Sequence, residues 1–224
     1  MKPYYEDGLV TLYHGDCREI TEWLAADVLV MDPPYGRAWK QGALKRSGSD
    51  GHGGIANDET TEVRDDVLRL WGDTRPGIIF GDLMLAPPIG TKLVGVYRKD
   101  LVSGARGAIG GVRRDAEAIY LTGKWRSGLG GRSSIFATRA MISGSHGVVA
   151  ANGGHPHTKA GDVMAELIAL TGGVIADPTA GGGSTLVAAK RLGRPAIGVE
   201  LEEGYCEVIA KRLDQGVLDF GEGA

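Results

Sequence analysis

Residues 28–36 have the sequence VLVMDPPYG, and the rest of the chain is interpreted from this segment outward. Its first four residues are apolar and predict a short strand that is buried on both faces, as in a parallel sheet. Asp32 follows at the carboxyl end of that strand, which is where open α/β sheets place their ligand crevices. The stretch therefore predicts a largely parallel α/β sheet with a binding site beside Asp32.

The four residues after this strand predict a site for a flat molecule that carries an amine. Pro33 and Pro34 have fixed φ angles and no N–H, so the carbonyl groups beside them have no ladder to join. The Asp32 carboxylate and one such carbonyl can accept from an exocyclic NH2 group, while the Tyr35 ring can stack on a heterocycle. A rigid turn at a strand end is the alternative interpretation, but the buried strand before it and Gly36 after it favour a binding site.

A second stretch, VIADPTAGGGST at 174–185, predicts a nucleotide-binding βαβ unit. A buried strand ends at Asp177, a glycine-rich turn leads into a helix, and the next strand, 195–200, ends at Glu200. Such a turn lets the backbone approach a ligand closely, and the acid can hold ribose hydroxyls. The turn departs from the G-x-G-x-x-G pattern because Leu186 stands at the last position, so an ordinary tight turn is the alternative.

The rest of the chain supplies further elements of the same architecture. Asp16 follows an early strand, either as a ligand-binding residue or as the cap of the next helix. Strands are expected at 9–13, 77–81, 92–97 and 118–121, the last antiparallel to the one before it, and helices at 18–25, 58–71, 163–170 and 205–213.

Length and charge limit the classes of protein that this chain can form. Its 224 residues suit one substantial domain, and its net charge of −3 argues against a uniformly basic coat for nucleic acid. Residues 92–139, however, carry ten basic and three acidic side chains, a net charge of +7. One face is therefore expected to meet a polyanion, and a solvated basic face without a partner is the alternative. The glycine-rich, irregular stretch at about 37–57 is expected to be a mobile loop that closes over substrate.

Cysteine usage and hydropathy exclude several other classes. Cys17 and Cys206 have no Cys or His at ligand spacing, so neither a disulfide framework nor a metal site is expected. A signal peptide pattern and a membrane-spanning apolar run are both absent from the sequence. We therefore expect a soluble, cytoplasmic protein.

Three motifs together resemble those of the S-adenosylmethionine-dependent DNA amino-methyltransferases: DPPYG at 32–36, DPTAGGGSTLVAA at 177–189 and GVELE at 198–202. Because the catalytic motif precedes the cofactor motif, the chain is similar to the permuted β class, found in bacteria and phages with or without a restriction nuclease. The resemblance runs from Leu9 to Leu213. It implies a Rossmann-like class I methyltransferase fold, with a seven-stranded, mostly parallel sheet, one antiparallel hairpin and helices on both faces, in a single domain over 1–224.

The resemblance also implies an activity and a role for each motif residue. The methyl group of S-adenosylmethionine would pass to the N6 amine of an adenine flipped out of DNA. The residues implied as catalytic are Asp32, Pro33, Pro34 and Tyr35, and those implied as cofactor-binding are Asp16, Asp32, His155, Thr158, Lys159, Asp177, Thr179, Gly181, Gly183, Ser184, Thr185 and Glu200.

Basic residues in two segments are the expected DNA contacts. A target-recognition insert at about 126–154 would be short, which predicts relaxed sequence specificity or a site shared across a homodimer. The expected DNA-binding residues are Lys40, Lys45, Arg46, Arg113, Arg114, Lys124, Arg126 and Arg132.

Three alternatives stay open at this point. N4-cytosine methylation uses the same chemistry, although Asp32 and Tyr35 favour adenine. Methylation of RNA or of a protein amide is the second, but in those relatives the cofactor motif comes first. The third is a catalytically inactive DNA-binding relative, because the family usually has Phe in place of Thr179 and Pro in place of Ala160. The intact catalytic motif argues against it.

Overall fold

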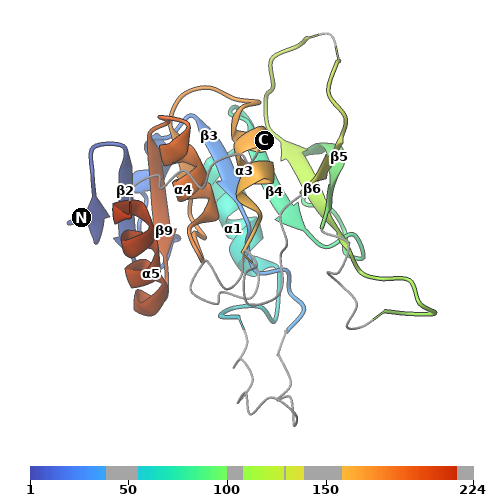
Figure 1. Cartoon of the computed structure of the whole chain (residues 1–224), viewed down its shortest axis with the longest axis horizontal. Helices are drawn as coiled ribbons and strands as arrows, with labels where there is room; N and C mark the ends of the chain where they lie inside the picture. The colour runs from blue at the N-terminus through green and yellow to red at the C-terminus, as the bar shows by residue number, and fades with distance from the viewer. Residues whose placement is uncertain (39–54, 100–107, 129, 139–157, 216–224) are drawn as a thin grey trace, which may run out of the picture.

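A mixed β-sheet forms the centre of the molecule (Figure 1). The computed structural model describes residues 1–38, 55–99, 108–128, 130–138 and 158–215. Within them the sheet has nine strands in the order β1-β2-β9-β8-β3-β4-β6-β5-β7. The strands are β1 Tyr5–Glu6, β2 Val10–His14, β3 Val28–Met31, β4 Gly77–Gly81, β5 Thr91–Arg98, β6 Ala116–Thr122, β7 Ile135–Ala137, β8 Ile175–Asp177 and β9 Ala196–Glu200.

The predicted α/β class is confirmed, but the expected count of seven strands is wrong. Strands β2, β9, β8, β3 and β4 are parallel, and β6 lies antiparallel between β4 and β5, as the sequence predicted for 118–121. The two additional strands, β1 and β7, pair at the outer edges with β2 and β5. They contain two and three residues, which is too short for a strand to leave a period of two in the sequence.

Strand β3 is buried on both faces, as its apolar run predicts. All four of its residues have no exposed surface. Val28 and Val30 pack in the core cluster that contains the apolar faces of α3, α4 and α5, while Leu29 and Met31 pack in the cluster on the other face with Trp23 and α1. Successive side chains of a strand point to opposite faces, so this one strand anchors both layers of helices.

The helices cover the two faces of the sheet. In Figure 1, α3, α4 and α5 lie side by side in front of it. On the opposite face the Trp23 and Trp71 rings stack at a centroid distance of 6.0 Å. No helix in the described part of the chain is long and apolar enough to cross a membrane. The helical elements are η1 Glu22–Ala25, α1 Glu62–Trp71, α3 Gly161–Ile168, α4 Ser184–Arg191 and α5 Glu203–Asp214.

Two helix predictions differ from the structure for local reasons. The helix expected over 18–25 is a single 3₁₀ turn, because Asp16 accepts from the backbone and side chain of Arg18 and holds the preceding residues in a loop. Helix α1 begins four residues later than expected. The buried Asp58 carboxylate accepts from the Gly36 N–H at 2.9 Å, which ties the start of this segment to the loop after β3.

Candidate active site

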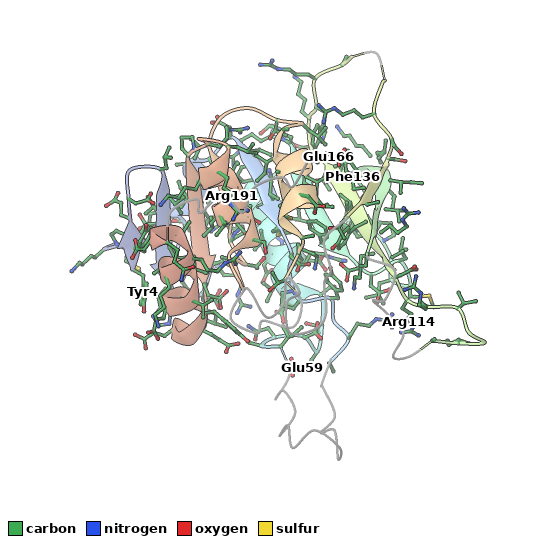
Figure 2. All side chains as sticks on the ribbon, viewed as in Figure 1. Tyr4, Glu59, Arg114, Phe136, Glu166 and Arg191 are labelled. Atoms are coloured by element: carbon green, nitrogen blue, oxygen red, sulfur yellow. The ribbon has the colours of Figure 1, made fainter. Side chains whose placement is uncertain are left out.

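A cleft of about 670 Å³ lies at the carboxyl ends of the parallel strands. Acidic residues reach it from four of them: Asp16 after β2, Asp32 after β3, Asp177 at the end of β8 and Glu200 at the end of β9. Glu117 joins them from β6, which runs in the opposite direction and so begins at the same edge. Because parallel strands end together, residues distant in the sequence converge here. Figure 2 labels Glu59 and Arg114 at this end of the molecule.

The loop after β3 holds the Asp32 carboxylate between two donors. Its Oδ1 accepts from the Tyr35 hydroxyl at 2.8 Å, and its Oδ2 accepts from the Lys159 ammonium at 2.5 Å. Gly36 turns the chain with a φ of +75°, and a Cβ at that position would lie 2.9 Å from the Thr60 backbone. The loop is therefore packed against the segment before α1, and this packing fixes the direction of the Asp32 and Tyr35 side chains.

Glu117 extends this cluster and was missed by the sequence analysis. Its Oε2 lies 3.2 Å from the Tyr35 hydroxyl oxygen and 3.3 Å from the Lys159 ammonium, and its Oε1 lies 2.5 Å from the Lys99 ammonium. Glu117 is only 8% exposed. A charged residue inside the otherwise apolar strand AEAIYL was the sign that could have identified it, since buried charges are almost always paired.

Burial and charge shape the chemistry of this cluster. Burial disfavours the charge of Lys159, but the Asp32 and Glu117 carboxylates outweigh it and hold the lysine pKa above its ordinary value. Burial and the same two carboxylates raise the pKa of Tyr35 well above its ordinary value. Near neutral pH, Lys159 is therefore a cation and the Tyr35 hydroxyl keeps its proton.

The other half of the cleft contains the two acids of the βαβ unit. Asp177 is 2% exposed and accepts from the Thr179 N–H at 3.2 Å and from the Thr185 side chain, but burial still raises its pKa to about 7. Glu200 accepts from the N–H groups of Gly181 and Glu202 at 2.7 and 2.8 Å, and burial raises its pKa as well. Hydrogen-bond donors without full positive charge surround both carboxylates, so this half suits a cationic or hydroxyl-bearing ligand.

A hydrogen bond joins the two halves of the cleft. The Ser184 hydroxyl, at the first residue of α4, donates to the Lys159 backbone carbonyl at 3.0 Å. Thr158 and Lys159 both line the cleft beside it. Gly183 does not line the cleft. It has a φ of +77°, and a Cβ there would lie 2.8 Å from the Ile209 side chain of α5, so its place in the structure is explained by helix packing.

Asp16 lines the cleft with its charge already balanced. Arg18 donates to both of its carboxylate oxygens, at 2.9 and 2.6 Å, and these hydrogen bonds lower the pKa of Asp16. The Arg18 guanidinium also lies 3.8 Å from the Asp66 carboxylate of α1. Among the described residues, no group of three or more His, Cys, Asp or Glu side chains could hold a metal ion.

The structure separates the expected DNA-binding residues into two groups. Arg113 and Arg114 line the cleft. Strand β6 begins at the cleft and ends at Thr122, opposite the first residue of β4. The loop that follows therefore lies at the end of the strands opposite the cleft, here called the far edge of the sheet (Figure 1). That loop contains Lys124, Arg126 and Arg132, none of which lines the cleft. The predictions for Lys40, Lys45, Arg46 and His155 lie outside the described residues, as do 39–54 of the expected loop and 139–154 of the expected insert.

Comparison with known proteins places this geometry in context. A family model described as DNA methylase, of the N6/N4 type, matches residues 55–212. A curated relative from Lactococcus lactis subsp. cremoris, the type II methyltransferase M2.LlaDCHI, is 39% identical over 67 residues. That match covers 29% of this chain and only 25% of the relative, so it spans about a quarter of the relative's length.

Two solved structures are similar over nearly the whole chain. The M1.HpyAVI–SAM complex is 19% identical, covers 92% of this chain and 100% of its own, and has a TM-score of 0.64. The PvuII DNA methyltransferase, described as cytosine-N4-specific, is 16% identical, covers 99% and 91%, and has a TM-score of 0.66. At these identities the similarity establishes the fold.

Proposed function

This chain belongs to the N6/N4 DNA methylase family, and from that premise we propose that it methylates the N6 amine of adenine in DNA, with S-adenosylmethionine as methyl donor. The observation that carries the proposal is the shared cleft. The amine-binding loop at Asp32 and the βαβ acids Asp177 and Glu200 open into the same cavity, so a base and a cofactor bound there would meet.

The cofactor half of the cleft fits S-adenosylmethionine. The Asp177 carboxylate is buried and has a raised pKa, and the ammonium of a methionine group would compensate its charge. The Thr179 hydroxyl is buried without a hydrogen-bond partner among the described residues, which is typical of a site that a ligand completes. Glu200, next to the Gly181 turn, is the proposed acceptor for the ribose hydroxyls.

The base half of the cleft would position the target amine. S-adenosylmethionine supplies an activated methyl group, so the protein contributes mainly orientation. Asp32 and the Pro33 carbonyl are the proposed acceptors for the two amine protons, and the Tyr35 ring is the proposed stacking surface. Asp at position 32 is what favours adenine over cytosine in this family pattern.

DNA is the proposed macromolecular partner. Arg113 and Arg114 lie at the cleft, where they could contact the phosphates on either side of a flipped nucleotide. Such contacts position the duplex and contribute affinity that depends on salt. The flipped base costs a few kcal/mol of stacking and pairing, which these contacts would offset.

Mass spectrometry of nucleosides tests the proposal directly. Purified protein is incubated with unmethylated DNA and S-adenosylmethionine, and the digested DNA is examined for N6-methyladenine and N4-methylcytosine. We expect methyladenine from the wild type and from Glu166→Gln, a change on the exposed face of α3. In Asp32→Ala we expect a loss of about 100-fold or more, since the amine is no longer positioned.

Each other outcome has a distinct meaning. N4-methylcytosine would keep the reaction and change the base. Neither product, with cofactor binding intact by calorimetry, would contradict DNA as the substrate. Neither product and no cofactor binding would indicate an inactive relative.

A further inference from the structure

The Tyr35 hydroxyl lies between two carboxylates. It is 2.8 Å from Asp32 Oδ1 and 3.2 Å from Glu117 Oε2. A phenol has a single O–H, so it donates to one acceptor at a time. The shorter distance indicates that Asp32 is its acceptor in this structure, with Glu117 within reach as a second acceptor.

The proposed reaction brings the target amine to the Asp32 carboxylate, whose Oδ1 already accepts from the Tyr35 hydroxyl. Lys159 already holds Asp32 Oδ2 at 2.5 Å. A carboxylate oxygen has two lone pairs, so a target amine displaces the Tyr35 hydroxyl where it approaches Oδ1 from the same side. A buried hydroxyl that lost its acceptor would carry the full cost of an unmade hydrogen bond. Base binding from this side therefore costs least when the hydroxyl has a second acceptor within reach.

We propose that Glu117 is a positioning residue for methyl transfer, which accepts the Tyr35 hydroxyl when the target amine takes Asp32 Oδ1. This inference rests on the proposed function. The handover requires only a small rotation of the hydroxyl, and it leaves the Tyr35 ring in place as a stacking surface. It also keeps Lys159 between both carboxylates, so the charge balance around Asp32 does not change during the reaction.

Glu117 is held rigidly enough to serve as this second acceptor. Lys99 binds its Oε1 at 2.5 Å, and Lys159 lies 3.3 Å from its Oε2. Its backbone is paired with Tyr97 in the β5–β6 ladder. Groups fixed from three sides keep their geometry when a ligand enters, which is how supporting residues preserve a reactive arrangement.

Glu117→Gln tests the inference, in the wild type and in a Tyr35→Phe background. In one orientation the new NH2 group replaces the acceptor that faces Tyr35 and Lys159, and in the other it faces the Lys99 ammonium. The neutral amide is therefore a weaker acceptor for the Tyr35 hydroxyl than the carboxylate. We expect kcat for DNA methylation to fall roughly 10- to 100-fold, the range for loss of a hydrogen bond to a charged group. The dissociation constant for S-adenosylmethionine, measured by calorimetry, should stay unchanged.

The Tyr35→Phe background separates the handover from a general structural effect. Without the hydroxyl nothing needs a second acceptor, so Glu117→Gln should then lower kcat by a factor several times smaller than in the wild type. An equal loss in both backgrounds would overturn the handover. A kcat for Glu117→Gln as high as that of the Glu166→Gln control would overturn any role for Glu117.

Two further measurements remove ambiguity. Glu117→Asp keeps the charge, and it should recover part of the lost kcat. If circular dichroism shows that Glu117→Gln does not fold, Glu117→Asp takes its place in both backgrounds. A kcat for Glu117→Asp equal to that of its parent in both backgrounds would then contradict the inference. Absence of product from the wild type would overturn the proposed function itself, and that result is seen before any variant is made.

Discussion

The two halves of the cleft balance their charges in opposite ways. In the base half, Asp32 and Glu117 contact the ammonium groups of Lys159 and Lys99. In the cofactor half, Asp177 and Glu200 are buried, more so than Asp32, yet their described partners are backbone N–H groups and a hydroxyl. The base half is therefore electrostatically complete in the protein alone, whereas the carboxylates of the cofactor half have no fully charged partner among the described residues and suit a ligand that carries positive charge.

The largest effect on stability is expected from removing the cation that Asp32 and Glu117 share in the base half. Lys159→Met keeps most of the apolar length of the side chain but leaves Asp32 and Glu117 without their shared cation. Removing one partner of a buried ion pair costs about 3–5 kcal/mol, so the free energy of unfolding should fall by that amount in urea titrations.

An exposed ion pair provides the matched control. Lys211 lies 2.6 Å from Glu207 on α5, and both side chains are more than half exposed. Lys211→Met should leave the free energy of unfolding nearly unchanged, because exposed ion pairs contribute little to stability. If both lysine variants lost the same small amount, the charge balance of the base half would have no energetic importance.

A smaller effect, opposite in sign, is expected from the incomplete half. The pKa of Asp177 is about 7 in the folded protein, against an ordinary value of 3.8. The folded state therefore binds a proton more tightly than the unfolded state, and this group lowers stability as the pH rises from about 4 to 7. Asp177→Asn should remove that loss, so the variant without ligand gains roughly 2–4 kcal/mol relative to the wild type at pH 8.

Cofactor binding should show the same titration from the other side. Ionised Asp177 is the form that attracts an ammonium group, so the affinity for S-adenosylmethionine should rise between pH 6 and 8. Calorimetry across this range checks the slope, and Asp177→Asn should bind weakly at every pH. An affinity in the wild type that does not change with pH would argue against Asp177 as the partner of a cation.

The smallest effects are expected at the cleft mouth, outside both halves. Replacing Arg113 and Arg114 by Gln should weaken DNA binding and reduce the slope of log affinity against log salt by about two, if each contacts one phosphate. Affinity for the cofactor should not change. Fluorescence anisotropy with labelled DNA measures the slope.

The other basic group supplies the comparison for this test. Lys124→Gln with Arg126→Gln changes the same charge at the far edge of the sheet and should leave the slope unchanged. An equal effect of both double variants would show that DNA also extends along that edge.

The sequence predicted the elements with strong local patterns. Two segments, 28–36 and 174–185, each consist of a short apolar strand followed by a turn rich in proline or glycine. Both strands and the helix after the second turn lie where they were expected. The short edge strands β1 and β7 were missed because their pairing is a tertiary effect. The start of α1 was misplaced because Asp58 bonds to a loop 22 residues away.

The candidate site was predictable where residues follow strands directly, and less so where it depends on three-dimensional proximity. Glu117 joins the cluster because β6 reverses direction, and only its buried charge in the strand pattern indicated this. The same reversal carries Lys124 and Arg126 away from the cleft. Gly183 packs against Ile209 of α5, a helix that begins only after β9, so this contact depends on the tertiary fold and has no local sequence signal.

The hydrogen bond from Ser184 to the Lys159 carbonyl means that the two substrates should not bind independently. The cofactor would bind beside the start of α4, and the target base would bind beside the Asp32 carboxylate that Lys159 contacts. Each ligand would therefore help to fix the Ser184–Lys159 contact on which the other depends. Such coupling is reciprocal: whatever factor the cofactor adds to DNA affinity, DNA must add to cofactor affinity. Ser184→Ala should reduce both factors together, which would make this single hydroxyl a determinant of the cooperativity between cofactor and DNA.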